Sequence, residues 1–312
     1  MPLIKHITNK FESKYKFYFI LLLELLFLPF LYLNNFLKYY FIKTNQKITS
    51  LTERKPVKSE LVSVCIHDWA GYDTKRTKYL KNGKSFLCGL DFQVDRFKSQ
   101  MTKYKLNIFI TISDNNKFNK NYNYPYPIKY VSNIGMDFSG YSDFYNNLKD
   151  KENQYIILTN SSVNFKQNNF LDDYIRYFEK NKNIGMLGIS YNSKKYQTLI
   201  RNNFTPHLQT FFLLTTLDIL NEVVKRNNNK FPGTGIVDKR LLIVDGEILL
   251  SNIVLELGYQ LACVLEDGSV YAFDIFCKNN LGNKSWKIKD GDYRYNVLNP
   301  NSINMLNTNV NI

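Results

Sequence analysis

The sequence predicts an α/β protein: a mostly parallel β-sheet flanked by helices and preceded by an N-terminal hydrophobic helix. Short runs of Val, Ile and Leu without polar alternation recur along the chain, as in parallel strands that are buried on both faces. Between these runs lie segments with apolar residues at spacings of three and four, which are typical of amphipathic helices. Strands that alternate with helices favour βαβ units and a parallel sheet.

The N-terminal part of the chain is predicted to hold a membrane anchor. A basic segment, residues 1–16, precedes an almost wholly apolar run from Phe17 to Leu33, which extends to residue 42 if a few polar residues are tolerated. A spanning helix needs roughly 20 apolar residues, with a lower limit of about 17. We therefore predict an anchor helix over 17–42, with an in-plane or buried helix as the alternative. Residues 43–60 are polar and are predicted to form a linker.

Flanking charge and cysteine usage predict a single-pass membrane protein whose catalytic domain is cytoplasmic. Six basic residues follow the apolar run and four precede it, and an excess of Lys and Arg favours the cytoplasmic side. The four cysteines form no C-x-x-C pair, which indicates buried free thiols in a reducing compartment.

The folded domain is predicted over residues 61–285, followed by a loose tail over 286–312. Its strands are expected at Leu61 to Ile66, Leu106 to Ile112, Ile128 to Val131, Tyr155 to Leu158, Ile184 to Ile189 and Leu261 to Leu265. A further strand, His207 to Thr215, is expected to run into a helix. The helices are expected at Phe86 to Tyr104, Phe138 to Leu148, Leu171 to Lys180, Leu217 to Lys225 and from Asp245 to Leu257.

Two polar clusters follow predicted strands and are expected to form two sides of one binding crevice. The first holds Asn133, Gly135 and Asp137, and the second holds Thr159, Asn160, Ser161 and Ser162. Ligands of open α/β sheets bind beyond the carboxyl ends of the strands. His67 and Asp68 end the first strand and Asp114 follows the second, which places them at the same edge of the sheet.

A third cluster opens the last predicted helix. Asp245 is expected to cap that helix and Glu247 to lie in its first turn. Both acids have a purely structural alternative, because a helix dipole favours carboxylates at its start. The same alternative, an N-cap, applies to Asp137, and a plain polar turn is the alternative for Asn160 and Ser161.

The net charge of +14 indicates anionic partners, but the basic residues are dispersed rather than clustered. We therefore expect no nucleic-acid partner, since nucleic-acid binding of that kind would rest on a basic patch. The three histidines are too scattered for a zinc site. No metal-ligating residues are predicted.

Four motifs in order carry a resemblance to a known family. They are N-x-G-x-D-F-x-G-Y from Asn133, T-N-S-S from Thr159, H-L-Q-T-F-F from His207 and D-G-E-I-x-L-S from Asp245. Together they resemble the rhamnan-synthesis type of glycosyltransferase over roughly residues 61–274. The resemblance implies a GT-A-like fold, a nucleotide-sugar donor, a transferred sugar such as rhamnose, and a polysaccharide or glycolipid acceptor. The chain departs from the family pattern at Ser139, Ser161 and Thr210, where Gly, Asp and Ser are usual.

The chemistry of sugar transfer and the places of these residues at strand and helix ends suggest their roles. Glu247, and next Asp245, would be the general base that deprotonates the acceptor. Donor contacts would come from Asn133, Gly135, Asp137, Asn160, Ser161, Ser162, Asp114 and His67. Typical GT-A enzymes hold a divalent cation on Asp-x-Asp where this chain has Thr159-Asn160-Ser161, so a metal is not expected to be required. The alternative function is a non-catalytic, membrane-tethered protein of the same fold that binds glycan or nucleotide.

Overall fold

The computed structural model describes residues 18–19, 22–23, 25–30, 33, 51–79, 83–194, 204–274 and 301–307. Most of the predicted anchor over 17–42, and the whole basic segment before it, lie outside these residues. Within the described parts of the chain, no helix has the length and hydropathy needed to cross a membrane.

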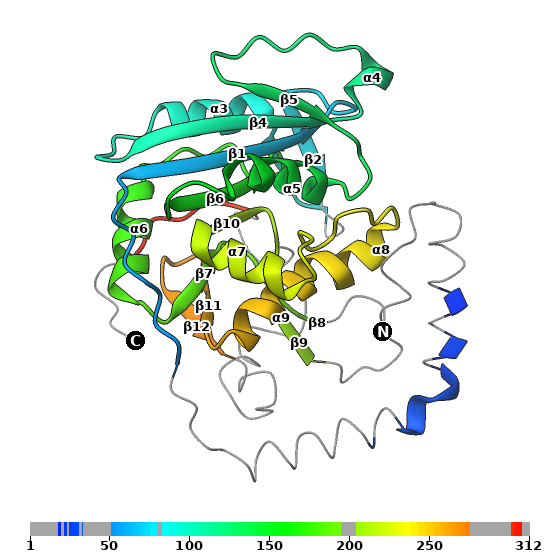
Figure 1. The fold of residues 1–312 in the computed structure, drawn as a ribbon. Helices are drawn as coiled ribbons and strands as arrows, with labels where there is room; N and C mark the ends of the chain where they lie inside the picture. Colours follow the sequence, from blue (N-terminus) through cyan, green and yellow to red (C-terminus); the bar gives the residue numbers. More distant parts are fainter. Residues whose placement is uncertain are drawn as a thin grey trace.

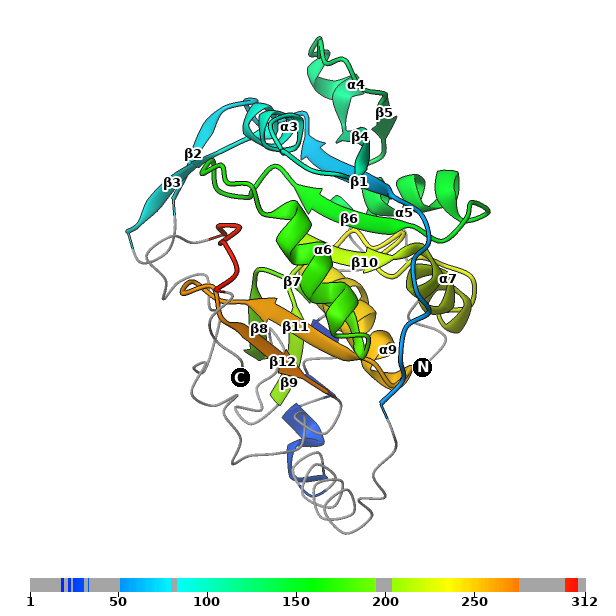
Figure 2. The ribbon, with the colours of Figure 1, turned by 90° about the vertical axis from the view of Figure 1, so that its left-hand side faces the viewer.

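An eight-stranded sheet forms the centre of the domain, with the strand order β12-β11-β7-β10-β6-β1-β4-β5 (Figures 1 and 2). Its strands are β1 (Leu61–Trp69), β4 (Lys105–Ser113), β5 (Ile128–Val131), β6 (Tyr155–Asn160), β7 (Ile184–Gly188), β10 (Phe212–Thr216), β11 (Gln260–Val264) and β12 (Val270–Phe273). Parallel pairing joins β5, β4, β1 and β6, and also β7 and β11. The sheet is thus mostly parallel, as predicted, and is consistent with a GT-A-like fold.

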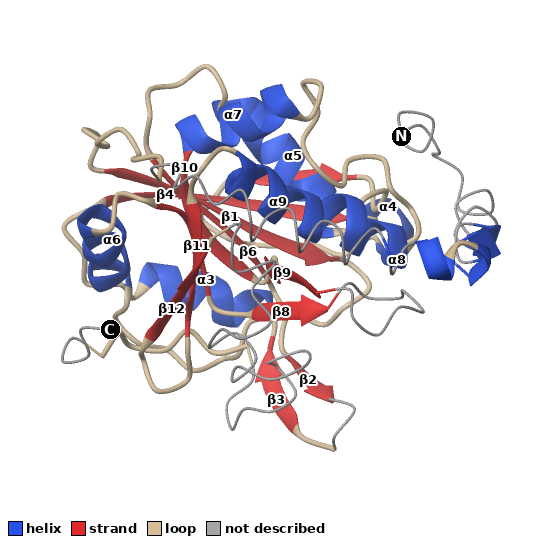
Figure 3. Cartoon of the chain, turned by 90° about the horizontal axis from the view of Figure 1, so that it is seen from below, coloured by secondary structure: helices blue, strands red, loops and turns tan. Residues whose placement is uncertain are grey.

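Helices cover both faces of this sheet (Figure 3). One face packs against α5 (Asp137–Leu148), α7 (Leu217–Arg226) and α9 (Leu249–Glu256), and the other against α3 (Leu90–Lys98) and α6 (Leu171–Lys180). Strand β1 shows why: the Cys65 side chain joins the first core, whereas Val64 and Ile66 join the second. This alternation buries both faces of a continuous apolar run.

Two predicted elements are wrong in extent, and both errors arise at local breaks in the backbone. The helix expected from Phe86 instead begins as β3 (Ser85–Cys88), which pairs with β2 (Arg76–Tyr79), and α3 starts only after Gly89. Gly89 has a φ of +143°, and a Cβ there would lie 2.1 Å from the carbonyl oxygen of Thr74. Only glycine fits that approach, so the chain turns before the helix starts.

The strand expected from His207 to Thr215 is in fact two strands. Strand β9 (Phe204–Leu208) pairs with β8 (Tyr191–Lys194) outside the main sheet, and β10 begins at Phe212. Strand β10 runs antiparallel to both of its neighbours, β6 and β7. Between the two strands, the backbone N–H of Gln209 donates to the carbonyl of Ser190 over 2.9 Å, which redirects the chain into the sheet.

The domain extends beyond both predicted boundaries. Arg54, within the predicted linker, is buried, and its Nε donates to the carbonyl of Ile184 over 2.6 Å. Residues 301–307 of the predicted loose tail also pack on the domain: Ile303 is buried in its core, and the Asn301 carbonyl accepts from the N–H of Asn164 over 3.0 Å. The described domain therefore comprises residues 51–274 with their gaps, together with this short segment.

Candidate functional site

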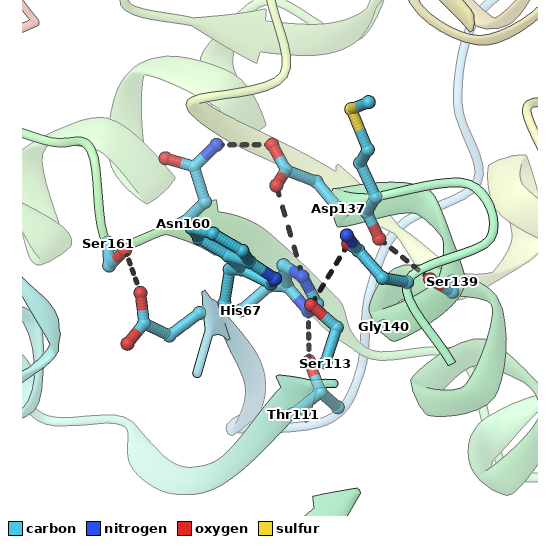
Figure 4. A network of polar contacts seen from close by, with 12 residues as sticks. His67, Thr111, Ser113, Asp137, Ser139, Gly140, Asn160 and Ser161 are labelled. Carbon is cyan, nitrogen blue, oxygen red and sulfur yellow. Dashed lines mark hydrogen bonds and ion pairs between the residues drawn. The ribbon is translucent and has the colours of Figure 1, made fainter. Parts of the chain in front are cut away.

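Three neighbouring strands end in a polar network at one edge of the sheet (Figure 4). The pairing register places His67 on β1 beside Thr111 on β4 and Asn160 on β6. The Nδ1 atom of His67 lies 3.0 Å from the hydroxyl of Thr111, and its Nε2 lies 3.9 Å from Oδ1 of Asp137. Asn160 donates from Nδ2 to Oδ2 of Asp137 over 2.6 Å. The structure therefore brings the predicted residues His67, Asp137 and Asn160 together.

Burial sets the charge of this network. His67 is almost fully buried, and desolvation lowers its pKa, although the nearby Asp137 opposes that shift. The imidazole is therefore neutral at neutral pH. The Asp137 side chain is 36 % exposed, so its carboxylate meets both the network and solvent.

A tight turn before α5 places Asp137. Gly135 and Met136 both have positive φ, +100° and +48°, and the N–H of Phe138 donates to the carbonyl of Gly135 over 2.9 Å. Met136 rather than Asp137 precedes the first residue of the helix, so the N-cap alternative for Asp137 is wrong. The Asp137 side chain is instead aimed across the strand ends at Asn160.

One turn further into α5, Gly140 lies against the network. A Cβ at this position would lie 2.2 Å from Nδ1 of His67 and 2.3 Å from Oγ1 of Thr111. Gly140 thus allows the helix to approach the strand ends closely enough for Asp137 to meet His67. Its place in N-x-G-x-D-F-x-G-Y was visible in the sequence, but its contact with β1 and β4 was not.

The Asn160-Ser161-Ser162 triplet uses its own side chains to fix its shape. The Oδ1 atom of Asn160 accepts the N–H of Ser162 over 2.9 Å, and the N–H of Ser161 donates to the carbonyl of His67 over 2.9 Å. The Ser161 hydroxyl donates to Oδ1 of Asp68 and accepts from Nη2 of Arg76, the latter over 2.8 Å. The polar-turn alternative thus describes only part of what this triplet does.

Asp68 and Arg76 extend the site, and Arg76 was not predicted from the sequence. The carboxylate of Asp68 lies 3.6 Å from Nη1 of Arg76, and the Asp68 side chain is fully buried. Burial raises the pKa of Asp68 to about 6, although Ser161 and Arg76 both favour its charged form. The strict alternation of R-T-K-Y over β2 was the one sequence signal that could have indicated a strand carrying this arginine.

Glu247 reaches the same edge from a different direction. The helical stretch after α8 (Lys239–Leu242) contains a π-helical turn, η2 (Ile243–Ile248), before α9 begins. Asp245 and Glu247 lie inside this turn, so Asp245 is not an N-cap and Glu247 is not in a first turn, which corrects both structural alternatives. Such turns are frequent at functional sites because they redirect side chains within a helix.

Contacts around Glu247 connect it to the triplet. Thr210 donates from Oγ1 to Oε1 of Glu247 over 3.3 Å, and Tyr141 of α5 donates from its hydroxyl to the carbonyl of Thr210 over 2.9 Å. The next residue, Phe211, accepts the N–H of Asn160 at its carbonyl over 3.1 Å. Asp245 contributes its backbone carbonyl, which accepts the N–H of Gly233 over 2.8 Å.

The remaining predicted residues lie at the margin of this edge. Asn133 accepts at Oδ1 from the hydroxyl of Ser113 at the end of β4, over 3.2 Å. Asp114 has a φ of +59° and accepts at Oδ2 from Nε1 of Trp69 over 3.2 Å. It also pairs with Lys117 over 3.2 Å. Asp114 thus orders the loop beyond β4 through Trp69 and Lys117.

The donor atoms of the triplet do not fit a divalent cation. The triplet has no carboxylate, and the side chains of Asn160 and Ser161 already bind Asp137 and Asp68. Across the described residues, no three His, Cys, Asp or Glu side chains gather closely enough to hold a metal ion.

One of the buried thiols borders this network: Sγ of Cys65 lies 3.6 Å from the hydroxyl of Thr111. Cys65, Cys88 and Cys263 are free and buried, and burial raises the pKa of Cys65 to about 12, so that thiol is inert at neutral pH. Cys277 lies outside the described residues.

No protein family model matches the chain, and no curated protein matches it. Among solved structures, the chain is similar to the mannosyltransferase PcManGT from Pyrobaculum calidifontis in complex with GDP-Man and Mn²⁺, with a TM-score of 0.38 and 11 % sequence identity. The similarity covers 81 % of this chain and 67 % of that one. At this TM-score and identity the likeness does not assign a function to the chain.

Proposed function

We propose that the chain is a glycosyltransferase that moves a sugar from a nucleotide-sugar donor to a glycan or glycolipid acceptor. One observation carries the proposal: the four separate motifs of the rhamnan-synthesis resemblance are hydrogen-bonded to one another at the carboxyl edge of the sheet. Asp137 of the first motif binds Asn160 of the second, and Asn160 binds Phe211 of the third. Thr210 of the third motif then binds Glu247 of the fourth.

A second contact between the last two motifs strengthens this argument. The hydroxyl of Ser251 accepts the N–H of Leu208 over 3.1 Å, and Ser251 is buried. Motifs that matched only by sequence order would have no reason to meet in space. Their contact at the edge where α/β sheets bind ligands supports a common site. The step from fold to activity still rests on the family resemblance.

In this proposal Glu247 is the general base. It takes the proton of the acceptor hydroxyl as that oxygen bonds to the anomeric carbon of the donor sugar. The bond from that carbon to the diphosphate breaks, and the nucleoside diphosphate leaves with the electron pair. Asp137 and Asn160 are proposed to hold the donor sugar, with a deoxyhexose such as rhamnose as the transferred group by analogy to the family.

Donor binding and slow donor hydrolysis test the proposal. The full chain is incubated with UDP-, GDP-, CMP- and dTDP-sugars, with Mn²⁺ and with EDTA, while thermal shift and sugar release are recorded. We expect stabilisation and turnover with donors of one nucleotide, and turnover that persists in EDTA because the triplet offers no carboxylate to a metal. A folded chain that is stabilised by a nucleotide-sugar but releases no sugar would favour the alternative, a non-catalytic binding protein. The absence of a carboxylate from the Asn160-Ser161-Ser162 triplet is the feature that favours this alternative.

A further inference from the structure

A short hairpin lies beside the triplet, and the roles proposed above leave it without a function. It consists of β2 and β3, and Figure 2 shows it extending beyond the carboxyl end of β1. Arg76, the first residue of β2, donates from Nη2 to the hydroxyl of Ser161 over 2.8 Å. Its guanidinium also lies over the ring of Tyr72, 4.0 Å from the centroid. The hairpin thus holds a cation in a fixed place against the middle residue of the triplet.

A second cation on the same strand, Lys78, lies against Phe211. Side chains alternate along a strand, so Arg76 and Lys78 share one face. Both are half-buried, whereas Thr77 and Tyr79 between and beyond them are exposed. The Nζ atom of Lys78 lies 5.3 Å from the ring centroid of Phe211, the residue whose carbonyl accepts the N–H of Asn160.

We infer that Arg76 and Lys78 form the binding site for the diphosphate of the nucleotide-sugar donor and supply the positive charge there. This inference rests on the proposed function and adds a site that the sequence motifs do not contain. Arg76 contacts Ser161, the position where the resemblance has Asp, and Lys78 lies against Phe211, which is hydrogen-bonded to Asn160. A guanidinium suits phosphate because its planar fork offers several N–H donors, and a lysine acts as a compact point charge.

The acids next to Arg76 and Asn160 are already bound within the network. Asp68 is the carboxylate in contact with Arg76, and it is buried and shared with Ser161. Asp137 is bound on its other side by Asn160 and lies 3.9 Å from His67. During transfer, the two cations stabilise the negative charge that develops on the leaving nucleoside diphosphate.

The test compares variants of the full chain by isothermal titration with UDP, GDP, dTDP, CMP, the matching nucleosides and inorganic pyrophosphate. Arg76→Ala and Lys78→Ala should each raise the Kd for the preferred nucleoside diphosphate about 10- to 100-fold, the size of a lost charge-assisted bond. Nucleoside binding should not change. Lys75→Ala is the matched control, because Lys75 immediately precedes β2 but is exposed, with its Nζ 5.7 Å from the ring of Phe92.

Arg76→Lys keeps the charge and guards against misfolding of the alanine variant, and it should retain more affinity than Arg76→Ala. Diphosphate affinities in Arg76→Ala and Lys78→Ala equal to that of Lys75→Ala would overturn the inference while leaving the proposed function intact. A preference of the wild type for CMP, a monophosphate, would overturn it as well. If the wild type binds none of the nucleotides, the proposed function fails and the inference fails with it.

Discussion

Gly140 offers a sharp test of how the site is assembled, because a single methyl group there would enter the His67 network. The Cβ of Gly140→Ala would lie 2.2 Å from Nδ1 of His67 and 2.3 Å from Oγ1 of Thr111. Both neighbours belong to central strands and are almost fully buried, so neither can move away freely. The helix must shift, or the 3.0 Å contact between His67 and Thr111 must break.

The cost follows from three contributions. Overpacking a well-filled core costs about 1–3 kcal/mol, and leaving a buried polar group without its partner costs about 1–3 kcal/mol. Alanine gains about 0.5–1 kcal/mol over glycine within a helix. The balance predicts that Gly140→Ala lowers the free energy of unfolding by about 1–5 kcal/mol and displaces Asp137.

Urea denaturation followed by circular dichroism measures this loss. Asn146→Ala is the matched control, since Asn146 is exposed on the same helix and its replacement should be neutral or slightly stabilising. A Gly140→Ala protein as stable as the wild type would refute the close approach of α5 to the strand ends.

Two further predictions concern the surroundings of the triplet. Because the pKa of Asp68 is raised to about 6, above its unfolded value near 4, the folded chain binds the extra proton between these values. This carboxyl should therefore lower the free energy of unfolding by about 3 kcal/mol as pH rises from about 4 to 6. Urea denaturation midpoints measured across this pH range should fall in the wild type, and Asp68→Asn should lack this fall. Identical pH profiles for both proteins would contradict the burial of this acid. Asn301 donates from Nδ2 to the carbonyl of Ser162 over 3.0 Å at a φ of +55°, so Asn301→Gly removes the bond without backbone strain. Asn301→Gly should lower the free energy of unfolding by about 1 kcal/mol and weaken nucleotide-sugar binding in titration calorimetry. Asn304→Ala, the control, loses a similar bond to Leu265 and should lower stability as much without changing donor affinity. Equal donor affinities in the two variants would show that the C-terminal segment does not position the triplet.

Most strands of the central sheet and several polar clusters were predictable because local patterns determine them. Ile128–Val131 and Leu171–Lys180 were predicted with their observed bounds; the helix has apolar residues at helical spacing, and the short strand precedes a polar glycine turn. The ends of parallel strands meet at one edge by topology alone, so Asn160 and Asp137 could be grouped before the fold was known.

The parts that escaped prediction depend on contacts between distant segments. Arg76 lies 85 residues from Ser161 in sequence, and nothing in R-T-K-Y indicates which surface the hairpin will cover. The role of Gly140 depends on the close approach of α5 to strands β1 and β4, which a Cβ at this position would prevent. The π-helical turn that redirects Glu247 has no signature in a hydrophobic pattern with helical spacing.

We propose that this edge transfers sugar with Glu247 as the base. The most direct test of this proposal is sugar release from the preferred nucleotide-sugar by the wild type and by Glu247→Gln, with donor affinity measured in parallel by titration calorimetry. We expect Glu247→Gln to lower the rate about 10²- to 10⁴-fold, the size of a general-base contribution, with donor affinity and Tm unchanged. Equal rates in the two proteins would contradict the role of Glu247, and no release from any donor by the folded wild type would contradict the assignment as a transferase.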